Sequence, residues 1–258
     1  MLPEILTHKR RELASLRKRS VIDMEREIAE LPSTRDFAGA LRKSGSISLI
    51  AEIKRRSPSK GRLSDYLDPA ATAQIYESAG ASAVSVLTDT HYFDGSDSDL
   101  VAARECTSLP VLRKDFIVDE YQVLQSRLIG ADAILLIIAA LSPGELVRLS
   151  RMAAAVGLHV LTEVHEEREI EIALKAGSGI IGINNRNLKT FEVSLSTTER
   201  LRSLIPSDIV CVSESGIKNR EDILRVQASG ADAVLVGEGI VTAEDPVLQI
   251  RKLLGVRS

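Results

Sequence analysis

Glu52 and Lys54 are the first residues of this chain whose types and spacing suit acid–base chemistry. They alternate with Ala51 and Ile53. Successive side chains of a β-strand point to opposite faces, so the two charged side chains share one face and the two apolar ones share the other. A buried ion pair is costly without further hydrogen bonds. A functional role is therefore favoured over a structural ion pair, which remains the alternative.

Two later segments each carry one charged residue in alternation with apolar ones. Lys114 shares the face of Leu112 and Phe116, and Glu163 shares that of Leu161. A partly desolvated lysine near another cation loses its proton more easily. We therefore predict a lowered pKa for Lys114 and an acid or base role. A lysine in a solvent-facing loop is the alternative.

Asn184 and Arg186 follow a further apolar segment and also share a face. A guanidinium binds carboxylates through two parallel hydrogen bonds, and an asparagine amide can hold a hydroxyl group. These side chains are thus suited to an anionic substrate. Loop capping is the alternative.

Glycines follow the last two apolar segments, in Ser213-Glu-Ser-Gly216 and Val236-Gly-Glu-Gly239. Glycine lets backbone N–H groups approach a phosphate, often beside a short helix. Either segment alone is weak evidence. The pair predicts a phosphate site after the last two strands.

Short β-rich segments alternate with amphipathic ones and must position these residues. The pattern predicts eight strands, at about 48–54, 83–88, 110–114, 133–138, 159–163, 180–184, 209–213 and 233–237. Glycine and small residues precede a strand in four similar junctions, which indicates repeated βα units. The junctions read AGASAVSVL, IGADAILLI, KAGSGIIGI and SGADAVLVG.

Eight evenly spaced units favour an α/β fold of the closed (β/α)₈ TIM-barrel type, whose active site lies at the carboxyl ends of the strands. An open doubly wound sheet is the alternative. Residues 1–45 precede the first strand and predict one or two extra helices. We expect a single domain over 1–258, with 1–45 as a helical extension and 46–258 as the barrel.

Composition narrows the function further. A formal net charge of −3 argues against a nucleic-acid surface, and no apolar run is long enough for a membrane span. The two cysteines are far apart and favour a reducing cytoplasm. The spacing of histidines and acids indicates no metal site. Of the four histidines only His91 is expected near the active face, whereas His165 is interpreted as the start of a charged helix.

Five strings resemble the indole-3-glycerol-phosphate synthase family of tryptophan biosynthesis. They are AEIKRRSPSKG (51–61), SVLTDTHYFDGS (85–96), PVLRKDFIVDEYQV (110–123), INNRNLKTFEV (183–193) and SESGI (213–217). The resemblance covers essentially the whole chain and implies a TIM barrel with an N-terminal helical segment. It also implies a carboxy-lyase that closes the pyrrole ring of 1-(2-carboxyphenylamino)-1-deoxyribulose 5-phosphate, without cofactor or metal.

The resemblance also implies roles. Lys114 matches a general acid and Glu163 a carboxylate that assists dehydration. The other matches lie at the reacting centre (Glu52, Lys54), around the substrate's hydroxyl and carboxylate (Asn184, Arg186), in the first loop (Ser57, Ser59), against the aromatic ring (Phe116, Leu135), beside the site (Glu214, Ser215) and at the phosphate (Lys54, Gly216, Gly237, Glu238). Glu214 is counted with the catalytic residues.

Two alternative functions are weighed against the resemblance. Phosphoribosylanthranilate isomerase would need an inward cysteine at the first strand, which is not seen, and a non-catalytic barrel would not need intact charged strand ends. The expected partner is a small phosphorylated anion rather than nucleic acid or membrane. We expect a cytoplasmic monomer, with association with other pathway enzymes left open.

Overall fold

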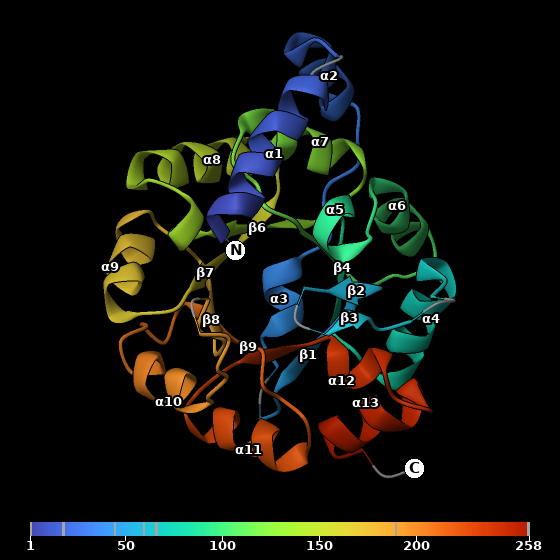
Figure 1. Ribbon diagram of the computed structural model, residues 1–258, viewed down its shortest axis with the longest axis vertical. Coiled ribbons are helices and arrows are strands. Elements are labelled where there is room, and N and C mark those ends of the chain that lie inside the picture. The colour runs from blue at the N-terminus through green and yellow to red at the C-terminus, as the bar shows by residue number, and fades with distance from the viewer. Residues whose placement is uncertain are drawn as a thin grey trace.

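Eight parallel strands close into a barrel in the order β1-β10-β9-β8-β7-β6-β5-β4 (Figure 1). The structure is a computed structural model and describes residues 2–16, 19–43, 45–58, 60–64, 67–188 and 190–256. Closure excludes the open sheet, and each predicted strand differs from the observed one by at most one residue at either end. The strands are β1 (Ser48–Ile53), β4 (Ala83–Leu87), β5 (Val111–Lys114), β6 (Ala133–Ile137), β7 (His159–Val164), β8 (Ile180–Asn184), β9 (Val210–Glu214) and β10 (Ala233–Val236).

Helices surround the barrel (Figure 1), and six of the eight given below begin at a residue whose side chain caps the helix. Asp68 caps the helix that starts at Pro69, and Ser142 with Glu145 forms a capping box. The surrounding helices are α4 (Pro69–Ala79), α6 (Asp97–Glu105), α7 (Glu120–Leu128), α8 (Pro143–Ala155), α9 (Glu167–Lys175), α10 (Ser196–Arg202), α11 (Arg220–Ala228) and α13 (Pro246–Leu254). The described part of the chain has no helix long and apolar enough to cross a membrane.

Short elements follow several strands. A small antiparallel hairpin, β2 (Arg56–Ser57) with β3 (Gly61–Arg62), comes after β1. The sequence pattern did not predict it, because two-residue strands leave no periodicity. The other short elements are α5 (Thr90–Phe93), the 3₁₀ helix η1 (Ile138–Ala140) and α12 (Glu238–Val241).

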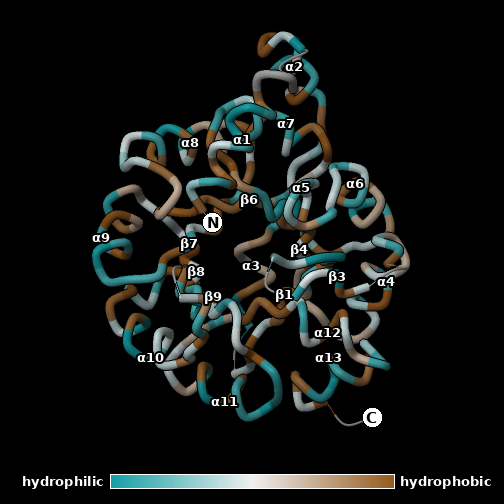
Figure 2. Tube along the Cα trace, in the orientation of Figure 1, coloured by the Kyte–Doolittle hydropathy of each residue, from teal (hydrophilic) through white to brown (hydrophobic). Residues whose placement is uncertain are grey.

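Apolar side chains form one layer inside the barrel and another outside it. Ile50, Leu112 and Leu161 belong to the inner cluster, whereas Ala51 and Ile53 belong to the outer one, against the helices. Figure 2 shows hydrophobic residues along the strands and hydrophilic ones on outer helices such as α9. The alternation predicted for β1 is confirmed, so Glu52 and Lys54 face the barrel interior.

In its described residues the N-terminal extension contains three helices rather than the predicted one or two: α1 (Leu2–Leu16), α2 (Val21–Ala29) and α3 (Phe37–Leu41). The chain reaches the mouth of the barrel with α1, packs α2 against α7, and buries α3 against the first residues of the strands (Figure 1). The third helix was missed because it has five residues, too few for a periodic signal.

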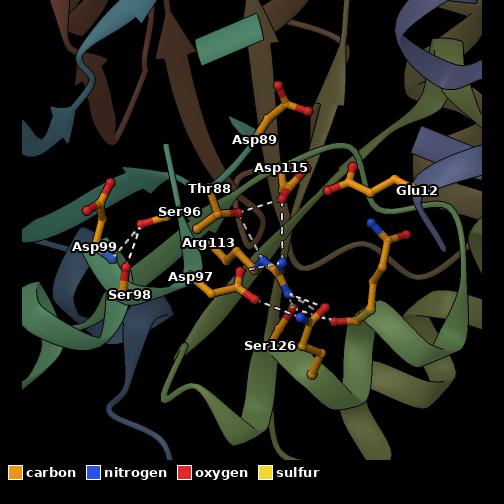
Figure 3. A network of polar contacts seen from close by, with 12 residues as sticks. Glu12, Thr88, Asp89, Ser96, Asp97, Ser98, Asp99, Arg113, Asp115 and Ser126 are labelled. Atoms are coloured by element: carbon orange, nitrogen blue, oxygen red, sulfur yellow. Dashed lines mark hydrogen bonds and ion pairs between the residues drawn. The ribbon is translucent and has the colours of Figure 1, made fainter. Parts of the chain in front are cut away.

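A buried ionic cluster fixes α1 to the barrel. The side chain of Lys9 is 3% exposed, and its Nζ lies 2.8 Å from Asp89 Oδ2 and 3.0 Å from Asp115 Oδ1. Arg113 continues the cluster on the other side of Asp115, with its guanidinium also contacting Thr88 and Asp97 (Figure 3). The extension is therefore an integral layer over the barrel mouth.

Candidate active site

A cavity of about 800 Å³ lies at the carboxyl ends of the strands and gathers the predicted site residues. Its walls include Glu52, Lys54, Ser57, Lys114, Phe116, Leu135, Glu163, Asn184, Arg186, Glu214, Ser215, Gly216, Gly237 and Glu238. Ser59 lies outside the described residues. Residues far apart in the sequence converge here because all eight parallel strands end at the same face.

Lys114 lies at the centre of a group of carboxylates. Its Nζ is 3.8 Å from Glu52 Oε2 and 3.7 Å from Glu214 Oε2, and the side chain is 17% exposed, which excludes a solvent-facing loop lysine. The predicted lowering of its pKa is wrong. Burial acts to lower the pKa, but Glu52, Glu214 and Glu163 outweigh it and raise the pKa. Lys114 is therefore protonated in the free protein.

Glu52 pairs closely with the second lysine. Its Oε1 lies 2.7 Å from Lys54 Nζ. Burial would raise the pKa of Glu52, yet Lys54 and then Lys114 lower it, so the carboxylate is ionised. Gly237 leaves the space that this carboxylate occupies, because a Cβ at position 237 would collide with Glu52 Oε1.

Glu214 is the least compensated carboxylate of the cavity. It is buried, and its Oε1 has no hydrogen-bond partner. Burial, followed by the charge of Glu163, raises the pKa of Glu214 to about 8. A Cβ at position 182 would collide with the same Oε1, so Gly182 provides the space for this side chain. Glu214 thus carries a proton near neutral pH, unlike Glu52.

Glu163 has the opposite protonation state. Burial acts to raise its pKa, but contacts with His165 and Lys114 lower it well below the usual range. His165 Nε2 lies 3.3 Å from Glu163 Oε1. The interpretation of His165 as the start of a solvated helix was therefore incomplete. Its spacing of two residues from Glu163 was the available signal, although β7 ends at Val164, one residue before His165.

His91, the histidine expected near the active face, does not line the cavity. It lies in α5 and stacks on His8, with ring centroids 4.3 Å apart. In the described part of the chain no group of histidine, cysteine and acidic side chains is arranged for a metal ion. The charged side chains that line the cavity belong to lysine, arginine, glutamate and aspartate residues.

Asn184 and Arg186 both line the cavity, and the loop-capping alternative is partly right for Asn184. The backbone N–H of Arg186 donates to Asn184 Oδ1 over 3.0 Å. Between them Asn185 is buried, and its Nδ2 donates to Ser213 Oγ and to the carbonyls of Glu214 and Ser215. Asn185 was not predicted, because the alternation that assigned Asn184 and Arg186 to one face assigned Asn185 to the opposite one.

The predicted phosphate side of the cavity has backbone geometry suited to an anion. Ser215 and Gly216 have φ angles of 65° and 88°, so two consecutive residues adopt the left-handed conformation. Gly237 is the N-cap of α12, and its carbonyl accepts the N–H groups of Ile240 and Val241, which leaves the N–H groups of Glu238 and Gly239 without a partner within the helix. Such turns and helix ends direct N–H groups toward one point and favour negative charge there.

Comparison with known proteins fits this geometry. The family model described as indole-3-glycerol phosphate synthase matches residues 2–253. The chain belongs to the indole-3-glycerol phosphate synthase family. An enzyme of that name from Chlorobium phaeovibrioides is 49% identical over 95% of both chains. Another, from Acetivibrio thermocellus, is 45% identical over 99% of this chain and 100% of its own. The predicted family and its carboxy-lyase activity in tryptophan biosynthesis are confirmed, and the isomerase is excluded.

Solved structures support the fold alone. A mutant tryptophan synthase alpha-subunit from Pyrococcus furiosus superimposes with a TM-score of 0.64 at 15% identity, covering 83% of this chain and 99% of its own. A thiamine phosphate pyrophosphorylase from the same organism gives 0.61 at 18% identity, covering 81% and 94%. The predicted TIM barrel is confirmed by these likenesses and by the strand order.

The synthase family resemblance also predicted an apolar wall, and such a wall exists. Leu135 is buried in the inner cluster, and Phe116 packs against that cluster. The ring of Phe93 lies 6.2 Å from that of Phe116, and Ile5 of the extension lines the same cavity. One side of the cavity is therefore apolar, and the other carries the charged groups.

Proposed function

We propose that this cavity binds 1-(2-carboxyphenylamino)-1-deoxyribulose 5-phosphate and closes its pyrrole ring, with Lys114 as general acid and Glu163 as general base. The aromatic carbon that bears the carboxylate attacks the ketone carbon, and the ketone oxygen takes a proton. Carbon dioxide then leaves, and loss of the new hydroxyl as water with one ring proton gives indole-3-glycerol phosphate. The observation that carries the proposal is the protonated Lys114 beside an ionised Glu163 in one cavity.

The protonation states support these roles. A general acid must hold its proton before the reaction, and the carboxylates around Lys114 ensure this. A general base must be ionised, and the lowered pKa of Glu163 provides that state. Substrate binding changes the charge around both groups, which brings their pKa values closer together for proton transfer.

The substrate's negative charges match the polar side of the cavity. We infer that the phosphate binds the backbone N–H groups of Gly216, Gly237 and Glu238, with Lys54 neutralising its charge. A carboxylate at Glu238 would repel a phosphate if it pointed toward it. Its side chain instead lies 3.8 Å from Lys60 Nζ, so only the backbone N–H of Glu238 is assigned to the phosphate. Arg186 would take the carboxylate region and Asn184 a hydroxyl.

The apolar side of the cavity suits the aromatic ring. Phe116 and Leu135 supply a nonpolar contact surface for it. An apolar environment disfavours the carboxylate relative to neutral carbon dioxide, which helps decarboxylation. Ser57 lies in the hairpin after β1 and accepts a hydrogen bond from the Lys60 N–H, so it can order that loop beside the substrate.

For the protein as a whole we propose one domain made of barrel and extension, acting as a cytoplasmic monomer without a cofactor. The buried contacts between α1 and the barrel support a single unit. Association with other pathway enzymes would not require a change in this site.

The test is direct. Purified protein is mixed with the anilino-deoxyribulose phosphate, and indole absorbance and fluorescence are followed. We expect both signals to appear, with release of one carbon dioxide per indole formed. Folded protein that gives neither signal would contradict the proposal and favour a non-catalytic barrel.

A further inference from the structure

We propose that His165 is a positioning residue that holds the Glu163 carboxylate in the cavity and decides which glutamate of the site acts as the base. The inference rests on the proposed function, because it concerns the base of that reaction. His165 does not line the cavity, so it would act only through Glu163.

The geometry places the imidazole between two carboxylates. His165 Nε2 lies 3.3 Å from Glu163 Oε1, and Nδ1 lies 3.4 Å from Glu169 Oε2 in α9. Glu169 Oε2 also accepts the backbone N–H of His165 over 2.5 Å, which fixes the start of the loop. Both ring nitrogens are buried, and among the described residues their only close contacts with charged groups are these two carboxylates. The side chain is 14% exposed and thus largely shielded from solvent.

Every charged group packed around Glu163 bears on its protonation. Lys114 from β5 attracts a negative charge there, and Asn184 from β8 donates a hydrogen bond to it. Glu214 from β9 and Glu52 from β1 repel it. Lys114 is already shared between Glu52 and Glu214, so a second cation is needed to keep Glu163 ionised.

His165 supplies that cation. Burial would lower its pKa, but Glu163 and Glu169 outweigh burial and raise it to about 10, so the imidazolium persists at neutral pH. Glu163 and Glu214 repel each other and compete for one proton. With the imidazolium on the Glu163 side, the proton goes to Glu214. The histidine thereby fixes Glu163 as the base and leaves Glu214 protonated.

The test compares pH profiles of kcat/KM for the parent protein, His165→Asn and His165→Lys. Removing the cation raises the pKa of Glu163, so the acid limb of His165→Asn moves to higher pH. We expect a shift of about one unit, so the loss of kcat/KM approaches tenfold only at pH values on the acid limb and disappears at higher pH. His165→Lys restores a cation and should return the limb toward the parent position.

The matched control is His159→Asn, at the other end of β7. That imidazole lies 3.7 Å from Asp36 and is 30% exposed, away from the cavity. We expect no shift of the acid limb. An equal loss of kcat/KM at every pH in His165→Asn would overturn the proposal, since a merely structural role lowers activity without moving the limb.

A third variant covers the case in which His165→Asn does not fold. His165→Gln removes the same cation with a longer polar side chain. It should shift the limb in the same direction as His165→Asn, and an unmoved limb would contradict the proposal. NMR titration of the carboxyl carbon of Glu163, without substrate, tests the role of His165 separately from the proposed reaction. Its pKa can rise in the variant even if the parent shows no synthase activity.

Discussion

Two clusters of charge meet at the end of β5 and differ in how well they are paired. Asp115 has both oxygens occupied: Oδ1 accepts from Lys9 at 3.0 Å and the Phe116 N–H at 2.7 Å, and Oδ2 accepts from Thr88 at 2.6 Å. Lys114, the preceding residue, is 3.7 Å from Glu214, whose Oε1 has no partner. The contacts of Asp115 are close hydrogen bonds, whereas those of Lys114 with Glu52 and Glu214 are longer.

This difference in pairing distinguishes a cluster that stabilises the fold from one that is suited to catalysis. A buried carboxylate with several hydrogen bonds keeps a low pKa, as Asp115 does because Arg113 and Lys9 overcome its burial. A buried carboxylate without them has a raised pKa, as Glu214 does. Perturbed, under-paired groups in a cavity are typical of active sites, which sacrifice stability for function. The Asp115 cluster fixes α1, whereas the Lys114 cluster remains available to substrate.

The largest expected effect belongs to Lys114→Met. Loss of the general acid should lower kcat/KM by about 10³-fold, roughly 4 kcal/mol of barrier. The neighbouring carboxylates line an open cavity and can take up protons, so the unfolding midpoint should change little. Indole formation and thermal unfolding measure the two effects. Arg148→Met, which removes an exposed ion pair with Glu120, serves as the control. Turnover within tenfold of the parent would contradict the acid role.

Lys9→Met should give the opposite pattern, with stability lost more than activity. Removing the buried cation takes one ion-pair partner from each of Asp89 and Asp115, which costs about 3 kcal/mol of unfolding free energy. Denaturant unfolding measures this loss. The control is Arg26→Met in the same extension, whose contact with Asp23 is exposed and should not matter measurably. An unfolding free energy of Lys9→Met equal to that of the control would show that the cluster does not fix α1.

Glu214→Gln should have the smallest effect, visible as a change in pH dependence. The pKa of Glu214 is raised from 4.5 to about 8 on folding. Between these values the folded state binds more protons than the unfolded state, so this group makes stability fall as pH rises. The glutamine variant lacks this loss. The unfolding free energy of the variant minus that of the parent should therefore increase by more than about 1 kcal/mol from low to high pH in this window.

The comparison with Glu214→Gln is made at pH 4.5, 6 and 8 by denaturant unfolding. Below pH 4.5 the carboxyl is protonated in both states, so the difference between the two proteins should be constant there. A difference that does not vary with pH across the window would mean that Glu214 is better paired than its surroundings indicate.

The sequence by itself determined the strands and the direction of their side chains. Alternation in β1 assigned Glu52 and Lys54 to the interior, and glycine-led junctions predicted eight βα units. These features are local: strand periodicity and helix caps depend on neighbours within a few residues. The family resemblance added the set of cavity residues, and every described member of that set lines one cavity.

Only the tertiary structure decided how those charges act on one another. Barrel closure places β1 beside β10, and the register of β8 with β9 pairs Asn184 with Glu214. Three carboxylates from different strands thereby surround Lys114 and raise its pKa, where the sequence predicted a lower one. The role of His165 was hidden for the same reason. Protonation depends on distances and burial in space, and residues distant in sequence set both.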